Sequence, residues 1–236
     1  MARAKIISFL QMKGGSGKST LCANVAATLA DRQRVLLIDT DHPQYSLGNW
    51  FALREEGDRI TNMALVTART PARLQKEIRE NAGNYDYILV DGHPRISGMT
   101  RVAMMLSDLV LIPLSPSPVE VWATREIAEL AKLAMARRKD LLVRICWNRF
   151  RIRTHSAPEV VREAIRELAL QDFRVRLGYR VAYLDSFAEG RTVAEWSDTA
   201  AKLEIWSLTS SIKRLLAKQG GARLSSPARV DAFVNS

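Results

Sequence analysis

Two lysines stand five positions apart in a glycine-rich stretch near the start of the chain, KGGSGKST at residues 13–20. Glycines allow consecutive backbone N–H groups to turn inward around phosphate oxygens, where a bulky side chain would obstruct them. Lys18 can reach the β and γ phosphates of a nucleotide, and the Ser19 hydroxyl is a suitable Mg²⁺ ligand. The pattern GxxxxGK[ST] requires a glycine where this chain has Met12, so the stretch fits the variant K-G-G-x-G-K-[ST]. We therefore expect the following residues to bind nucleotide: Gly14, Gly15, Ser16, Gly17, Lys18, Ser19 and Thr20.

A carboxylate suited to metal binding follows an apolar segment further along the chain, YDYILVD at residues 85–91. An apolar strand that ends in an aspartate has the Walker B form, in which the carboxylate holds Mg²⁺ directly or through water. We expect Asp91 to have this role beside Ser19.

The glycine-rich loop is similar to that of the ParA/MinD family of deviant Walker A P-loop ATPases. Within the family, the chain resembles most the small ParF-type ATPases that partition plasmids or position other cargo. The resemblance extends over residues 1–218 and implies ATP and Mg²⁺ as cofactors. It also implies a role for the extra lysine, Lys13, which in this family reaches across a dimer interface to the phosphates held by the other subunit. An ATP-dependent homodimer with slow, partner-stimulated hydrolysis is therefore expected.

Further roles follow from the same resemblance. The segment DTDHPQ (39–44) is similar to the family's second conserved element. Asp39 is expected near the water shell of Mg²⁺, and Asp41 is expected to orient or activate the attacking water. Lys13, Lys18 and Asp41 are thus the expected catalytic residues. His42 is a departure from the family pattern and is interpreted as a loop residue that faces solvent.

Two further features have counterparts in the same family, and a possible histidine site is considered beside them. Asn148 ends a strand at a position from which the family contacts the adenine base. The proline-rich turn at 113–118 resembles a part of the ParF-type dimer interface, and a rigid surface turn is a compatible alternative. A metal site formed by His42 and His93 is disfavoured, because two histidines without a third ligand make a poor site.

Strand and helix patterns alternate along the chain and must position these residues. Apolar runs predict strands at 6–10, 35–38, 87–90, 109–112 and 141–146, with a weaker one at 63–66. Helices are predicted at about 18–31, 71–82, 98–107, 119–138, 157–170 and 199–218. This alternation predicts a single α/β P-loop NTPase domain over 1–218, with a mostly parallel, twisted sheet and helices on both faces. Residues 219–236 are rich in Gly, Ser, Ala and Pro, which predicts a flexible tail.

The net charge of +10 is concentrated in one part of the chain, since residues 137–180 contain twelve Lys and Arg but five Asp and Glu. Such a segment suggests a polyanionic partner, with DNA ahead of anionic membrane, although a solvated arginine-rich helix surface is the alternative. The arginines expected to contact the backbone of nonspecific double-stranded DNA are Arg149, Arg151, Arg153, Arg162, Arg166, Arg174 and Arg176.

Two classes of function compete. The first is a cytoplasmic, nucleoid-associated ATPase that binds DNA in its ATP state and positions a plasmid, a chromosome or a large protein assembly. A cargo-adaptor protein would release it by stimulating hydrolysis. The second is a MinD-like ATPase that cycles on membranes through a basic and apolar segment at 210–223, although this segment fits the last helix of the domain body better. Reductases and cluster carriers of the same fold need paired cysteine ligands, which the distant Cys22 and Cys146 do not provide.

Overall fold

The computed structural model describes residues 3–151, 157–219 and 224–235. Its sheet has seven strands, all parallel, in the order β3-β2-β4-β1-β5-β6-β7. The strands are β1 (Lys5–Phe9), β2 (Val35–Asp39), β3 (Met63–Thr67), β4 (Tyr87–Asp91), β5 (Leu109–Leu114), β6 (Leu142–Phe150) and β7 (Gln171–Gly178).

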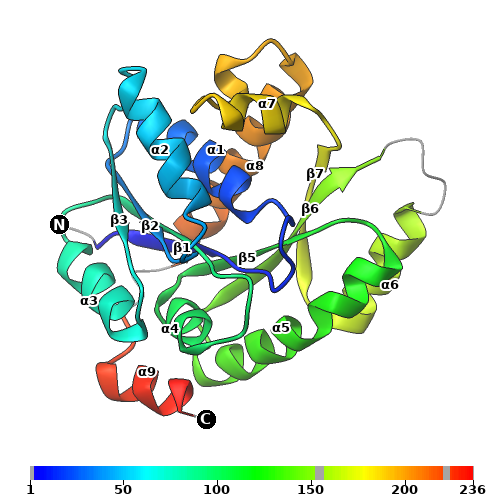
Figure 1. The fold of residues 1–236 in the computed structure, drawn as a ribbon. Helices are drawn as coiled ribbons and strands as arrows, with labels where there is room; N and C mark the ends of the chain where they lie inside the picture. Colours follow the sequence, from blue (N-terminus) through cyan, green and yellow to red (C-terminus); the bar gives the residue numbers. More distant parts are fainter. Residues whose placement is uncertain (1–2, 152–156, 220–223, 236) are drawn as a thin grey trace.

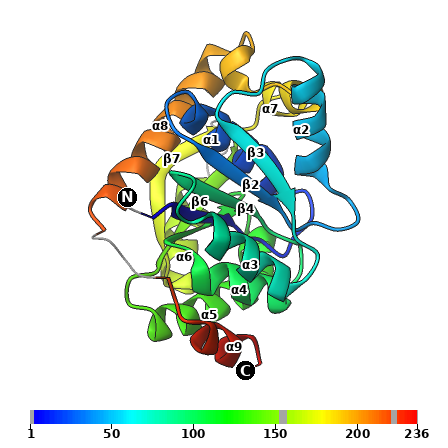
Figure 2. The ribbon, with the colours of Figure 1, turned by 90° about the vertical axis from the view of Figure 1, so that its left-hand side faces the viewer.

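Helices cover both faces of this sheet, as Figures 1 and 2 show. One face carries α3 (Pro71–Asn81), α4 (Gly98–Leu106), α5 (Pro118–Arg137), α6 (Ala157–Leu168) and α9 (Pro227–Val234). The other face carries α1 (Lys18–Ala30), α2 (Ser46–Glu56), α7 (Ala182–Ala188), the short 3₁₀ helix η1 (Val193–Glu195) and α8 (Thr199–Ala217). The α/β fold class and the parallel sheet predicted from sequence are confirmed.

The central strands are apolar throughout because each of their faces packs on a layer of helices. Ile6 and Val90 belong to the core on the α4 and α5 side, while Ile7 and Leu89 belong to the core under α1 and α8. Strands buried on both faces cannot show the alternation of a half-exposed strand. The apolar runs in the sequence therefore located β1 to β6 to within a few residues.

Several elements were absent from the sequence prediction: β7, α2, α7, η1 and α9. Strand β7 is an edge strand in which Phe173 and Leu177 are buried while Arg174 is exposed. This alternation was overlooked because the segment was interpreted only as part of the basic region. Helix α2 was also missed, since its mixed composition gives no clear apolar face, although Leu47 and Trp50 are buried.

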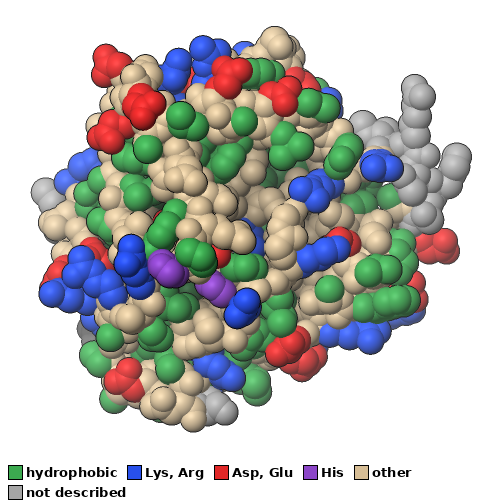
Figure 3. Space-filling view, viewed as in Figure 1, with side chains coloured by type: hydrophobic (Ala, Val, Ile, Leu, Met, Phe, Trp, Pro, Cys, Tyr) green, Lys and Arg blue, Asp and Glu red, His purple; other side chains and the backbone are tan. Residues whose placement is uncertain are grey.

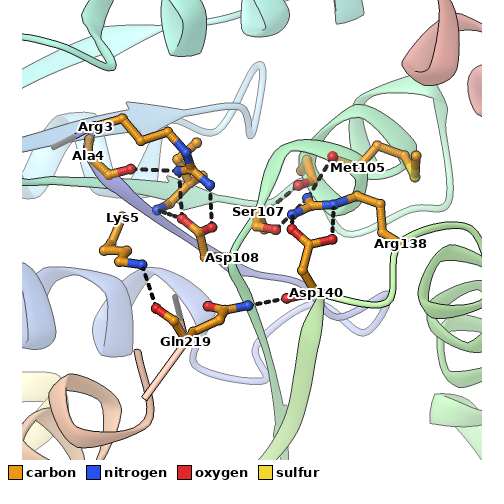
Figure 4. Close-up of polar contacts among 11 residues, drawn as sticks. Arg3, Ala4, Lys5, Met105, Ser107, Asp108, Arg138, Asp140 and Gln219 are labelled. Carbon is orange, nitrogen blue, oxygen red and sulfur yellow. Dashed lines mark hydrogen bonds and ion pairs between the residues drawn. The ribbon is translucent and has the colours of Figure 1, made fainter. Parts of the chain in front are cut away.

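Ion pairs with one buried member each link the turns at the amino ends of the strands (Figure 4). Arg3 donates two hydrogen bonds, of 2.8 and 2.5 Å, to the fully buried Asp108 carboxylate. Arg138 donates to the carbonyl oxygens of Met105 (2.8 Å) and Ser107 (2.6 Å) and pairs with Asp140 at 2.7 Å. These contacts join the turns at the end of the sheet opposite to the glycine-rich loop.

The predicted flexible tail contains an ordered helix. Helix α9 packs on α4, with Val230 and Phe233 fully buried against it. Arg101 donates to the carbonyl oxygen of Phe233 at 3.3 Å, and the Arg137 guanidinium lies 4.7 Å from the centre of the Phe233 ring. The polar composition of 219–236 concealed these apolar residues, which are three positions apart and lie on one face of a helix.

Candidate nucleotide-binding site

The glycine-rich loop connects β1 to α1 at the carboxyl edge of the sheet, where ligands of parallel α/β proteins bind. Gly15 and Gly17 have positive φ angles of 70° and 93°, which other residues rarely adopt. A β-carbon on Gly17 would also lie 2.3 Å from Nδ2 of Asn148. The loop therefore needs a glycine at position 17 both for its turn and for the approach of Asn148.

The two lysines of the loop have different surroundings. Lys18 is 6% exposed at the start of α1, and its Nζ lies 3.5 Å from the carbonyl oxygen of Lys13. Burial lowers the pKa of the Lys18 ammonium, while Asp91 and Asp41 act in the opposite direction. The side chain of Lys13 is 45% exposed and forms an ion pair with Glu120 at the start of α5. Lys18 is thus placed to bind phosphate within the site, whereas Lys13 lies at its surface.

Asp39 and Asp91 end adjacent strands, because β2 and β4 pair in a register that sets these two residues opposite each other. Both are fully buried. The Asp39 carboxylate accepts hydrogen bonds of 2.9 Å from the backbone N–H groups of Asp41 and Gly48. Burial raises the pKa of Asp39, although these hydrogen bonds partly offset the effect.

Asp91 is the least satisfied carboxylate of the site. Neither of its oxygens has a hydrogen-bond partner at normal distance among the described residues. Burial, together with the charge of Asp39, raises the pKa of Asp91 to about 7, although Ser19 and Lys18 favour its charged form. A buried carboxylate in this condition is well suited to a cation, and Ser19 adds a second oxygen ligand from the loop. Asp91 and Ser19 therefore fit Mg²⁺, which keeps several of its water ligands.

The other two predicted site residues also lie at this edge. Asp41 is 8% exposed and close enough to influence the pKa of Lys18. Asn148 lies near the end of β6 and donates a hydrogen bond of 2.9 Å to the carbonyl oxygen of Ser16 in the loop. A cavity beside this contact is lined by Gly17, Thr20, Leu21, Asn148, Arg149, Gly178, Tyr179, Arg180, Val181, Tyr183 and Leu184. Its apolar and aromatic members suit a nucleotide base, and those from β7 and α7 were not predicted from sequence.

Two histidines, His42 and His93, lie in the turns that follow β2 and β4. His42 is exposed, and its ring meets that of Tyr45 edge-on at 5.3 Å between centroids. Among the residues that the structure describes, no group of three or more His, Cys, Asp or Glu is arranged to hold a metal ion.

The predicted DNA-binding arginines are dispersed over several elements. On the face shown in Figure 3, basic side chains occur in separate groups rather than in one continuous patch. Arg162 and Arg166 alternate with Glu159 and Glu163 around one shallow depression on α6. Arg153 lies outside the described residues.

The remaining predicted arginines lie near β6 and β7. Arg149 borders the cavity beside Asn148, and Arg151 lies over the ring of Tyr179 at 4.8 Å. Arg176 is paired with Asp172 at 3.1 Å.

Arg174 lies in a groove between the edge strand β7 and the last turns of α8. Its lining has four cations, and of its described residues only Asp172 is acidic: Arg144, Asp172, Phe173, Arg174, Ser211, Arg214, Leu215 and Lys218. Asp172 also accepts a 2.7 Å hydrogen bond from Trp147. Sequence reasoning did not find this groove, because Arg144, Arg174 and Arg214 come from three separate elements.

The fold, the two-lysine loop and the adjoining carboxylates define a P-loop nucleoside triphosphatase of the deviant Walker A type. Residues 5–123, just over half of the chain, match the family described as ATPase MipZ, and the chain belongs to this family of ParA/MinD-related ATPases. The resemblance inferred from the sequence is thereby confirmed.

Two relatives illustrate the range of named functions. The chain is 27% identical over 193 residues to the maintenance of carboxysome distribution protein A of Halothiobacillus neapolitanus, covering 81% of this chain and 87% of that protein. It is 29% identical over 163 residues to the chromosome partitioning protein ParA of Myxococcus xanthus, covering 53% of this chain and 56% of that protein.

Solved structures share the fold at low sequence identity. A complex of McdA from Cyanothece with ATP is 16% identical, with a TM-score of 0.73, and the match covers 96% of this chain and all of that one. The septum site-determining protein MinD of Pyrococcus horikoshii with Mg-ADP is 18% identical, with a TM-score of 0.74, and the match covers 93% and 100%. The ligands of these two structures agree with the expected cofactors, ATP and Mg²⁺.

Proposed function

We propose that this protein is an ATPase that dimerises with ATP, binds DNA without sequence preference and positions a large cargo. The observation that carries the proposal is the difference in burial between the two lysines of the loop. Lys18 is buried beside Asp91, whereas Lys13 on the same loop is 45% exposed, as a lysine that contacts a second subunit must be. A lysine that reaches the γ-phosphate of a neighbouring subunit favours the dimer more strongly with ATP than with ADP.

Hydrolysis in this proposal uses the residues at the carboxyl edge of the sheet. Gly14 to Thr20 bind the phosphates, and Asn148 contacts the base beside the cavity at β7. Ser19 and Asp91 would hold Mg²⁺, with Asp39 near its water shell, and the ion would neutralise charge on the phosphates. Asp41 then accepts a hydrogen bond from the attacking water and orients it.

The groove between β7 and α8 is the strongest candidate for the DNA contact. It combines Arg174, which was predicted, with Arg144, Arg214 and Lys218. We rank Arg162 and Arg166 lower, because the neighbouring glutamates reduce their local charge. Contacts from both subunits of a dimer would bind one duplex together, which raises affinity without any new contact.

The cargo and the cellular setting follow from the relatives by analogy. A carboxysome distribution protein and chromosome or plasmid partition proteins are among them, so the cargo class is a large assembly or a DNA molecule. A cargo-adaptor protein would stimulate the slow basal hydrolysis. The protein would then act in the cytoplasm, in association with the nucleoid.

A membrane-cycling function is the weaker alternative. The described part of the 210–223 segment is mostly the end of α8, where Ile212 and Leu216 are buried against the domain, and residues 220–223 lie outside the described residues. No helix within the described part of the chain is long and apolar enough to cross a bilayer. In the described part of this segment, the apolar side chains that membrane binding would need pack against the domain instead.

Substitution of Lys13 tests the proposal directly. We expect Lys13→Ala to keep ATP binding, since Lys18 supplies the phosphate contact, but to lose the ATP-dependent dimer and tight DNA binding. Light scattering measures the molar mass and therefore the fraction of dimer. Fluorescence anisotropy with random duplex DNA, across a salt series, measures DNA affinity with ATP, with ADP and without nucleotide. Lys76→Ala is a matched control, because Lys76 is also an exposed lysine paired with a glutamate. Full dimerisation of Lys13→Ala with ATP would refute the assigned role of Lys13. Equal DNA affinity in all nucleotide states would refute the switch.

A further inference from the structure

The exposed lysine of the loop has a partner within its own chain. Nζ of Lys13 forms an ion pair with Oε1 of Glu120, which lies in the first turn of α5. The side chain of Glu120 is 20% exposed and that of Lys13 is 45% exposed. The N-terminus of a helix favours a carboxylate in its first turn, so the position of Glu120 is itself stabilised. Lys13 is thus the more exposed member of the pair.

A buried hydrogen-bond network fixes the start of α5, which carries Glu120, next to the loop that carries Lys13. Gln11, which is 2% exposed, donates to the Pro113 carbonyl oxygen (3.1 Å) and to Oγ1 of Thr124 (3.0 Å). The Thr124 hydroxyl in turn donates to the carbonyl oxygen of Glu120 at 2.7 Å. The network joins the start of the loop, the end of β5 and the first turn of α5. The contacts that place Glu120 beside Lys13 are therefore all within one subunit and need neither nucleotide nor a partner.

We propose that Glu120 is a positioning residue that holds Lys13 within its own subunit and sets the threshold for dimerisation. The inference rests on the proposed function, in which Lys13 crosses to the partner. Crossing separates Lys13 from Glu120 in both subunits, whichever nucleotide is bound. This loss weakens the ATP dimer and the ADP dimer by the same factor. The γ-phosphate offsets the loss in the ATP dimer, whereas the ADP dimer has no such compensation.

The dimer dissociation constant of Glu120→Gln tests this inference. It is measured by analytical ultracentrifugation with Mg²⁺ and either ADP or a non-hydrolysable ATP analogue. An exposed ion pair contributes little, but two are lost per dimer, so the variant should dimerise about two- to thirtyfold more tightly with either nucleotide. Glu126→Gln is the control, because Glu126 is exposed on the same helix and its substitution changes the charge equally. A gain of affinity with unchanged nucleotide binding cannot result from a damaged fold.

The outcomes separate this inference from the proposed function. An unchanged or weaker dimer in Glu120→Gln overturns the threshold role of Glu120, while the proposed function stands as long as Lys13→Ala abolishes the dimer. A dimer that Lys13→Ala leaves intact overturns both. Tightening in Glu126→Gln equal to that in Glu120→Gln also overturns the inference, because the effect would then reflect net charge alone.

Discussion

Among the described residues of the site, Asp91 is the carboxylate whose burial should reduce the stability of the folded protein most. It is fully buried next to Asp39, and its oxygens have no hydrogen-bond partner at normal distance among the described residues. Without a cation, the protein must either bury this negative charge or bind a proton. The raised pKa of about 7 is the consequence. Asp91 is therefore suited to binding Mg²⁺ at the expense of stability in the empty protein.

The pH dependence of stability tests this view of Asp91. Its pKa is 3.8 when unperturbed and about 7 in the fold, so the folded protein binds the extra proton between these values. The penalty is absent below about pH 4, grows as the pH rises to 7, and is constant above that. In the absence of Mg²⁺ and nucleotide, we expect Asp91→Asn to be more stable than the wild type at pH 8, by up to about 4 kcal/mol. Thermal unfolding of both proteins from pH 4 to 8 measures the difference.

The stabilising effect should disappear when ligand is present. With Mg²⁺ and ATP at pH 8, the wild type should gain more stability than Asp91→Asn, because the variant cannot supply the anionic ligand. If Asp91→Asn were less stable than the wild type at every pH, Asp91 would have a structural partner that this interpretation lacks.

At the scale of elements, α9 shows how a short helix depends on what it packs against. Helices of this length are not stable alone in water, so its eight residues fold only while they are docked on α4. Docking relies on the buried Val230 and Phe233 and on the two arginines that border the Phe233 ring. Helix α4 begins at Gly98, just after the loop that follows Asp91. The C-terminal helix therefore supports the element next to the candidate metal site.

Truncation of one side chain should release α9. We expect Phe233→Ala to increase amide hydrogen exchange in residues 227–234 by at least about tenfold, while β1 and β4 keep their protection. The loss of global stability should stay below the roughly 3–5 kcal/mol of a fully enclosed phenylalanine, because α9 can detach. Hydrogen exchange with mass spectrometry reports each segment separately.

Asp231→Ala is the matched control for this measurement, since Asp231 is exposed on the same helix. It should leave exchange in 227–234 nearly unchanged. If Phe233→Ala also left that exchange unchanged, docking through the Phe233 ring would be refuted.

At the scale of the whole molecule, the charge of the chain is distributed unevenly. The amino ends of the central strands carry paired charges, such as Arg3 with Asp108 and Arg138 with Asp140 (Figure 4). The groove at β7 gathers four cations around Asp172, which is itself paired with Arg176. A local excess of cations at one edge of the sheet is a better indicator of a polyanion-binding surface than the net charge of the whole chain.

Neutralising two of these cations tests where DNA binds. We expect Arg174→Gln with Lys218→Gln to weaken binding of random duplex DNA and to reduce the salt slope by about two for each chain in contact. Arg162→Gln with Arg166→Gln removes the same charge from α6 and should have the smaller effect. Anisotropy titrations from low to physiological salt give both slopes. An equal loss in both pairs would indicate a diffuse charge effect, and a loss only in the α6 pair would place the DNA on α6.

Several features of this protein can be predicted from its sequence because they are local. The loop at 13–20 contains its glycines, both lysines and its hydroxyl in eight consecutive residues, so its chemistry follows from their order. The strands before it and before Asp91 are short apolar runs, and their burial in a parallel sheet requires that composition. Nucleotide chemistry, fold class and family were therefore accessible without a structure.

Other features depend on contacts between residues that are far apart along the chain. Lys13 and Glu120 form an ion pair although they are 107 positions apart, and no local sequence pattern predicts this pair. The basic groove combines β6, β7 and α8, and the unsatisfied state of Asp91 arises from packing around it. The docking of α9 depends on the surface that α4 presents. Only the tertiary structure decides these, because it alone determines which distant groups share a site and which lose their contact with water.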